Sequence, residues 1–221
     1  MTFYSPTGIL SRDTPMPGDW LLPNGQIKLM TLDEIDKVSY ESRRMWCHRH
    51  TRYGLVTVEL IDWLDHYLGN RTAIEIGSGN GDLAYHLKIP GTDNKCQNWP
   101  DVKKMYNQMG DQPTIIYPDW VEEIDAVNAV WKHKPQVVIG NWVTHWIDPK
   151  KKVPVGGGSI YGVKEDKILK SGVTYIMIGN RENHSHKPIL KFPHEEIQLP
   201  FLRSRSVNND LNVVYVWKGR R

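Results

Sequence analysis

Three glycines alternate with polar residues in the segment 73–81, which reads Ala-Ile-Glu-Ile-Gly-Ser-Gly-Asn-Gly. Glycine allows left-handed backbone angles and lets a ligand approach the main chain closely. The apolar start of the segment predicts a buried strand, and residues 82–87 predict a helix whose free amides face the loop. The segment therefore predicts a ligand site at this loop, formed by Glu75, Gly77, Ser78, Gly79 and Gly81.

The same loop excludes two classes of phosphate ligand. A Walker A loop needs Gly-Lys-Ser/Thr, and that triplet does not follow here. The dinucleotide fingerprint G-x-G-x-x-G needs glycine at position 82, where the chain has Asp82. Because that carboxylate would lie against a pyrophosphate, the loop favours a ligand without phosphate.

Further polar and aromatic residues follow the other predicted strands. Asp93 and Asn94 end the second strand, and Asp93 comes 18 residues after Glu75, close to the spacing of an acid that binds ribose hydroxyls in related nucleotide folds. In open α/β sheets, ligands bind beyond the carboxyl ends of the strands. The remaining candidates of this kind are Asp119 and Trp120 after the third strand, and Asn141 and Trp142 after the fourth.

The pattern acid-x-Gly-x-Gly-x-Gly resembles motif I of class I S-adenosylmethionine-dependent methyltransferases, with matching order over residues 72–180. The resemblance implies S-adenosyl-L-methionine as cofactor, Asp93 at its ribose and Asp119 at its adenine. The chain also resembles uncharacterised methyltransferase-like proteins of bacteria and their phages, which have no known substrate. The shared motifs are Thr92-Asp93-Asn94, Gly140-Asn141-Trp142-Val143-Thr144-His145 and Ile178-Gly179-Asn180.

The resemblance places acceptor chemistry after the fourth strand, with Asn141, Thr144 and His145 as candidate catalytic residues. Amino-methylating nucleic-acid enzymes of this fold carry Asp/Asn/Ser-Pro-Pro-aromatic there. Trp142 and Val143 replace the prolines, which disfavours methylation of a base amino group. The loop of residues 148–162, with three lysines and a glycine run, is a candidate lid that would favour an anionic acceptor.

Alternating strands and helices predict the elements that position these residues. We expect a helix from Thr31 toward Met45, because Thr31 and Glu34 form a capping box, and an amphipathic helix around residues 60–68. The predicted strands are 72–76, 90–93, 114–117, 136–140, 172–178 and 212–217. The predicted helices between them are 82–87, 101–109, 121–134 and 164–170.

This order predicts an α/β fold: a Rossmann-like, doubly wound, mostly parallel sheet with helices on both faces. We expect an irregular N-terminal arm over residues 1–30, rich in proline and glycine, and a single domain over 31–221. The N-terminal helices of that domain occupy 31–70.

Composition excludes several classes of protein. A net charge of +3 does not indicate nucleic acid, although a nucleic-acid acceptor stays possible, and two cysteines do not form a disulfide framework. Without a visible signal peptide or apolar run of membrane length, we expect a cytoplasmic protein without membrane contact. The histidine and cysteine spacings fit no standard zinc site, so we expect no metal.

The function expected from the sequence is methyl transfer from S-adenosylmethionine to an unknown acceptor. Two alternatives stay open: an enzyme that cleaves the cofactor, and a noncatalytic module that only binds it. Nine tryptophans are unusual for 221 residues. We expect Trp63, Trp131 and Trp217 to pack in the core, and Trp120, Trp142 and Trp146 to lie at the ligand site.

Overall fold

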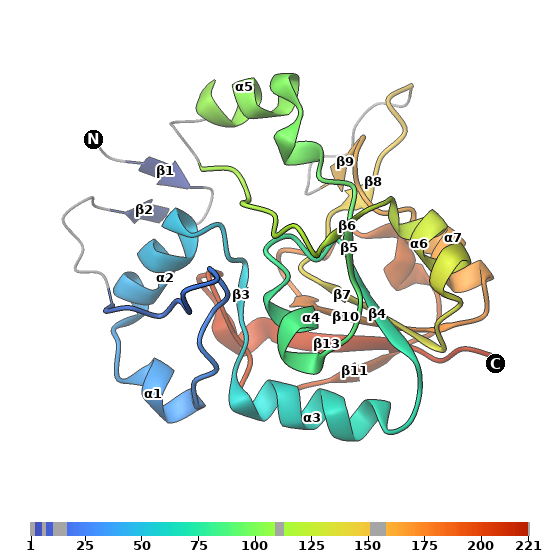
Figure 1. The fold of residues 1–221 in the computed structure, drawn as a ribbon, viewed down its shortest axis with the longest axis horizontal. Coiled ribbons are helices and arrows are strands. Elements are labelled where there is room, and N and C mark those ends of the chain that lie inside the picture. The colour runs from blue at the N-terminus through green and yellow to red at the C-terminus, as the bar shows by residue number, and fades with distance from the viewer. Residues whose placement is uncertain (1–2, 6–7, 11–16, 109–112, 151–157, 221) are drawn as a thin grey trace.

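The computed structural model describes residues 3–5, 8–10, 17–108, 113–150 and 158–220, and it contains a seven-stranded mixed sheet (Figure 1). Along the chain its strands are β4 (Ala73–Ile76), β5 (Gly91–Asp93), β6 (Glu122–Glu123), β7 (Val137–Asn141), β10 (Thr174–Asn180), β11 (Glu195–Ile197) and β13 (Asn212–Trp217). Their order in space is β11-β13-β10-β7-β4-β5-β6. The pairs from β10 to β6 are parallel, and β13 runs opposite to the other six strands of this sheet.

The strand order reverses between β4 and β7. From β4 the chain continues outward through β5 and β6, and β7 then lies on the other side of β4 and is followed by β10. Such a reversal is the topological switch point of a doubly wound sheet. The mostly parallel α/β fold expected from the sequence is therefore confirmed.

Two apolar layers cover the two faces of the sheet. One layer joins Ile139, Ile176 and Val214 to Leu64 of α3 (Val58–Leu68) and Leu83 of α4 (Asp82–Leu87). On the other face, alternate residues of the same strands pack against α6 (Ala126–His133) and α7 (Glu165–Lys170). Figure 1 shows α3 on one side of the sheet and α6 with α7 on the other. Because successive side chains of a strand point to opposite faces of the sheet, each strand contributes residues to both apolar layers.

The remaining elements lie around this sandwich. The helices are α1 (Leu32–Asp36), α2 (Tyr40–Arg49) and α5 (Pro100–Gln108), with short 3-10 turns at Cys96–Asn98, Pro188–Lys191 and Asn209–Leu211. The short strand pairs are β1 (Phe3–Ser5) with β2 (Gly8–Leu10), β3 (Gly54–Leu55) with β12 (Arg203–Ser204), and β8 (His145–Trp146) with β9 (Gly158–Ser159). Figure 1 shows α5 at the top, away from both covered faces of the sheet.

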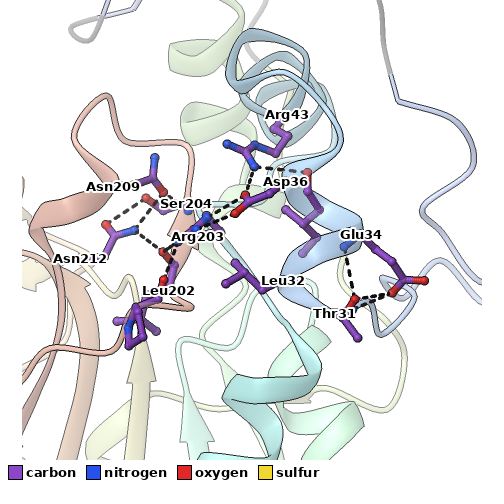
Figure 2. Close-up of polar contacts among 12 residues, drawn as sticks. Thr31, Leu32, Glu34, Asp36, Arg43, Leu202, Arg203, Ser204, Asn209 and Asn212 are labelled. Atoms are coloured by element: carbon purple, nitrogen blue, oxygen red, sulfur yellow. Dashed lines mark hydrogen bonds and ion pairs between the residues drawn. The ribbon is translucent and has the colours of Figure 1, made fainter.

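Residues 31–49 contain two helices, so the single helix expected from Thr31 toward Met45 is wrong. Thr31 and Glu34 form the expected capping box, but α1 ends at Asp36 and Ser39 caps a new helix, α2. Figure 2 shows how Asp36 fixes this corner by binding Arg43 of α2 and Arg203 of β12. The Asp36–Arg203 contact has a distance of 2.7 Å between Oδ2 and Nη2.

Two other predicted elements are wrong. Residues 113–118 form no strand, and the third strand of the sheet is β6, where Glu122 pairs with Thr92 and Glu123 with Asp93. The helix predicted from residue 121 begins at Ala126, capped by the Asp125 side chain. The inner face of that helix is formed by Ala129 and Val130, so Trp131 is 76% exposed and does not pack.

Candidate functional site

A cavity of about 500 Å³ opens beyond the carboxyl ends of β4, β5 and β7, where the strand order reverses. This is the position at which open α/β sheets bind ligands. Its volume lies within the range of small-molecule sites. Its wall contains the glycine loop, the end of β5, the segment after β7, the α2–β3 connection and residues 160–164.

The glycine loop adopts the left-handed backbone that its sequence requires. Gly79 has φ of 55° and Gly81 has φ of 76°. A Cβ atom on Gly81 would lie 2.5 Å from the Trp120 ring, whereas one on Gly79 would meet only Ile115, at 3.3 Å. Gly81 is therefore needed for packing of the loop, and Gly79 keeps main chain accessible at the cavity wall.

Asp93 connects the end of β5 to the glycine loop. Its Oδ2 accepts a hydrogen bond from the Gly79 amide at 3.0 Å, and its Oδ1 accepts one from the Lys95 amide at 2.8 Å. The Tyr117 hydroxyl is also hydrogen-bonded to this carboxyl. Burial raises the pKa of Asp93, and the amide contacts oppose that shift. Asp93 therefore both lines the cavity and positions the loop.

Glu75 lies at the base of the loop with a buried side chain. Its Oε2 accepts a hydrogen bond from the Ala84 amide at 2.9 Å, in the first turn of α4. Burial raises its pKa well above the ordinary value for glutamate. Because the carboxyl satisfies one of the free amides at the helix start, Glu75 ties β4 to α4.

A buried ion pair holds the start of α4 from the other side. Arg52 Nε donates to Asp82 Oδ2 at 2.9 Å, and Asp82 Oδ1 accepts from the Ile27 amide at 2.9 Å. Both charged side chains are less than a tenth exposed. Gln26 adds a contact, because its Nε2 donates to the Asn80 carbonyl oxygen at 3.0 Å. Residues 25–27 of the N-terminal region thus brace the glycine loop.

Aromatic side chains form a second wall of the cavity. The rings of Trp99 and Tyr161 meet edge to face, with centroids 4.9 Å apart. The Lys164 ammonium lies 4.9 Å from the centroid of the Trp146 ring. The Asn94 side-chain amide donates to the Tyr161 carbonyl oxygen at 2.9 Å, which joins this wall to the end of β5.

The segment after β7 turns sharply at Trp142, which has a positive φ of 58°. Its ring contacts His184 edge to face at 5.0 Å between centroids. A Cβ atom on Gly54 would lie 3.1 Å from the indole, so Trp142 also packs against β3. A left-handed non-glycine residue carries strain that surrounding contacts must hold, and such residues concentrate at functional sites.

Most of the predicted site residues lie in this one cavity. The cavity wall includes Glu75, Gly77, Ser78, Gly79, Asp93, Asn94, Asn141, Trp142 and Thr144. Gly81, at the end of the loop, packs against the Trp120 ring and does not line the cavity. Of the predicted lid, residues 151–157 lie outside the described residues, and residues 160–162 line the cavity.

His145 does not line the cavity. It is 6% exposed, and a Cβ atom on Gly158 would lie 2.8 Å from its Nε2, so the imidazole packs against β9. Burial and the nearby Lys187 lower its pKa. The structure therefore does not bring His145 together with Asn141 and Thr144, the other two candidate catalytic residues, in the cavity.

Asp119 and Trp120 lie at a separate hollow. This hollow is formed with Tyr85, Lys88 and Pro118, over α4 and outside the cavity. The expectation that Asp119 and Trp120 follow the third strand fails because β6 begins only at Glu122. In their place, Gln97, Ile115 and Tyr117 contribute to the cavity wall.

Sequence reasoning missed much of the wall that faces the glycine loop. The missed residues are Thr51, Arg52 and Tyr53 of the α2–β3 connection, Tyr106 of α5, and Tyr161 and Lys164. The Tyr106 hydroxyl is hydrogen-bonded to Tyr53, and the Tyr53 ring lies 3.6 Å below the Arg205 guanidinium. No local motif marks these residues, because contacts distant in sequence bring them together.

Two kinds of feature are absent from the described part of the chain. No group of three or more His, Cys, Asp or Glu side chains there is arranged to hold a metal ion. None of its helices combines the length and apolar character needed to cross a membrane.

Comparison with known proteins places the chain in no family. No family model matches it, and no curated protein does. A solved structure of Thermoplasma acidophilum 1320 matches 86% of this chain and 95% of its own, with 16% identity and a TM-score of 0.37. An O-methyltransferase family protein from Burkholderia thailandensis matches 86% of this chain with 10% identity and a TM-score of 0.34, and the match spans 63% of that protein.

Proposed function

We propose that the protein binds S-adenosylmethionine in this cavity and transfers its methyl group to an acceptor. The observation that carries the proposal is the meeting of the glycine loop and Asp93 in one cavity, at the reversal of a doubly wound, Rossmann-like sheet. The seven strands, numbered along the chain, lie in the order 3-2-1-4-5-7-6. The first five strands thus follow the dinucleotide-binding arrangement.

The residues around the glycine loop fit this cofactor better than a phosphorylated one. Asp82 stands where the dinucleotide fingerprint has its third glycine, at the helix start that would hold a pyrophosphate, so its carboxylate would repel that group. The loop contains no lysine to offset that repulsion. Gly79 leaves main chain accessible at the wall, as a closely held ligand requires. A ligand with a sulfonium and a ribose, and no phosphate, meets all three conditions.

The residues of the wall then have the following roles in the proposal. Asp93 and Asn94 bind the ribose hydroxyls, and the main chain of Gly77 to Gly79 follows the amino-acid portion. Gln97 and Ile115 border the adenine, in the place first assigned to Asp119 and Trp120. Bound S-adenosylmethionine supplies an electrophilic methyl group on a sulfonium.

The protein's own contribution is to orient an acceptor and exclude water. Asn141, Trp142 and Thr144 border the acceptor side of the cavity. Asn141 and Thr144 offer polar atoms for positioning, and Trp142 is held in place by His184 and Gly54. Holding an acceptor in line with the methyl group can supply much of the rate enhancement without a covalent intermediate.

Calorimetry with S-adenosylmethionine and S-adenosylhomocysteine tests cofactor binding. Asp93→Asn should weaken binding by about tenfold or more, because an amide replaces one of the two carboxyl oxygens that accept hydrogen bonds at this buried site. Asp65→Asn, on the exposed side of α3, is the matched control and should bind as wild type. Equal affinity of all three proteins would contradict the assignment of Asp93 to the ribose.

Incubation with methyl-labelled cofactor and cell extracts then tests transfer. Label in an extract component supports methyl transfer. Label recovered only in a small breakdown product of the cofactor would instead indicate cleavage, and binding without turnover would indicate a noncatalytic module.

A further inference from the structure

The acidic side chains of the described cavity wall are all engaged in hydrogen bonds within the protein. The four carboxyls of its described part all have partners: the Ala84 amide holds Glu75, Arg52 and the Ile27 amide hold Asp82, two amides hold Asp93, and Asp125 caps α6. Each carboxyl of the described wall therefore already accepts hydrogen bonds that hold the glycine loop or a helix start. The described wall contains no histidine.

A cationic donor, by contrast, is available in the described wall. The two cations of the described wall are Arg52, which is paired with Asp82, and Lys164. No ion pair joins Lys164 to an acidic side chain among the described residues, and its ammonium lies over the Trp146 ring. Burial raises the pKa of Tyr106 and Tyr117 above the ordinary value for tyrosine, and both hydroxyls are already hydrogen-bonded, Tyr106 with Tyr53 and Tyr117 with Asp93. Lys164 is therefore the one cation of the described wall without an acidic partner.

The same wall presents flat apolar surface. Among the described residues, seven aromatic side chains line the cavity: Tyr53, Trp99, Tyr106, Tyr117, Trp142, Trp146 and Tyr161. At its rim, Trp99 is 40% exposed and Ile160 is 45% exposed, although both are large and apolar. Aromatic faces and edges favour planar partners by offset or edge-to-face contact. A ring seated here would cover apolar surface that the chain itself leaves open.

We propose that the methyl acceptor is a small aromatic anion, a phenolate or an aromatic carboxylate, held against Trp99 and Trp146 with its charged oxygen at Lys164. This inference rests on the proposed function of the cavity. An acceptor that arrives ionised suits a described wall whose carboxyls already accept hydrogen bonds, because no proton needs to be removed. An oxygen lone pair forms the bond to the methyl carbon, the carbon–sulfur bond breaks, and its electron pair stays on sulfur.

Binding of 4-nitrophenol and benzoate in the presence of S-adenosylhomocysteine tests the proposal without turnover. Calorimetry gives the affinities, and the absorbance of 4-nitrophenol reports whether the bound molecule is ionised. We expect both anions to bind, the nitrophenol to bind as phenolate, and benzylamine, of similar shape but opposite charge, not to bind.

Two lysine variants separate a specific contact from general charge. Lys164→Met should weaken binding of both anions by about 10-fold to 100-fold, the cost of losing a charged hydrogen-bond partner, and leave binding of S-adenosylhomocysteine unchanged. Lys167→Met, three residues further along and exposed, is the matched control and should bind all three ligands as wild type. Trp99→Ala should weaken the anions as well, without loss of the cofactor product.

The outcomes distinguish this inference from the proposed function. If wild type binds no S-adenosylhomocysteine, the proposed function fails. If it binds the cofactor product, the inference is overturned by preference for benzylamine, by failure of both anions to bind, or by equal anion affinity in Lys164→Met and wild type. A loss of S-adenosylhomocysteine binding in Lys164→Met would assign this lysine to the cofactor and also overturn the inference.

Discussion

The buried Arg52–Asp82 pair gives the sharpest test of how the glycine loop is held. Arg52→Met removes contacts at 2.9 Å and 3.3 Å to Asp82, and two further bonds to the carbonyl oxygens of His50 and Gly25. Methionine retains much of the apolar stem. Asp82 is left with only the Ile27 amide among its recorded hydrogen-bond partners, in a site where it is 8% exposed.

Breaking a buried pair by removing one partner costs about 3–5 kcal/mol. For a chain of this size, that cost corresponds to a fall in Tm of about 6–20 °C. Replacing both partners, as in Arg52→Met with Asp82→Leu, removes the unpaired charge and leaves chiefly the loss of the Ile27 contact, about 1–3 kcal/mol. The double variant should therefore be more stable than Arg52→Met.

Urea unfolding followed by circular dichroism measures these free energies. Asp166→Asn is the control, because the Asp166–Lys170 pair is 51% and 74% exposed, and loss of such an i,i+4 pair costs less than about 0.5 kcal/mol. If Arg52→Met is no more destabilising than Asp166→Asn, the pair does not hold the start of α4. A double variant less stable than Arg52→Met would also contradict the reasoning.

Three further predictions follow from single side chains. Burial lowers the pKa of His184 to about 3, so between pH 3 and about 6.5 the unfolded chain binds a proton that the folded chain does not, and stability falls as pH falls. His184→Gln should remove up to about 1.4 kcal/mol per pH unit from the slope of unfolding free energy in that window; unchanged slopes would refute this. Gly81→Ala should destabilise the fold by about 2–4 kcal/mol, because its Cβ collides with Trp120, whereas Gly25→Ala, also at a positive φ (81°) but in open space, should cost about 1 kcal/mol; equal losses in urea unfolding would count against the contact. Binding of S-adenosylhomocysteine should quench tryptophan fluorescence, and Trp120→Phe should keep that quenching while Trp142→Phe reduces it. The reverse result would place the ligand in the hollow at Asp119 and Trp120 instead of the cavity.

Local patterns predicted the centre of the fold and one side of the site. The glycine loop, β4 and β5 are adjacent in sequence, so turn geometry and strand length are enough to find them. Asp93 lies at the expected strand end because β5 is the parallel neighbour of β4. These features depend on contacts within a short stretch of chain, which sequence periodicity reports well.

The errors arose where contacts distant in sequence decide the structure. Residues 114–117 are apolar and strand-like, yet the charged pair Glu122–Glu123 forms the edge strand, because it is there that the chain comes beside β5. Trp131 is apolar but exposed, because α6 begins five residues later than its pattern suggested. Tertiary context overrides propensity in both cases.

The aromatic wall could not be predicted from sequence for the same reason. Tyr53, Trp99 and Lys164 come from three segments that no motif connects, and the folded sheet brings them to one cavity. Of the three tryptophans expected at the ligand site, Trp142 and Trp146 line this cavity and Trp120 does not.

Calorimetric titration of the wild-type protein with S-adenosylmethionine and S-adenosylhomocysteine tests the central claim most directly. The proposed function predicts binding of both ligands at a single site, competition between them, and weaker binding in Asp93→Asn. No binding of either ligand at about 1 mM, where even a weak site would be half filled, would contradict it.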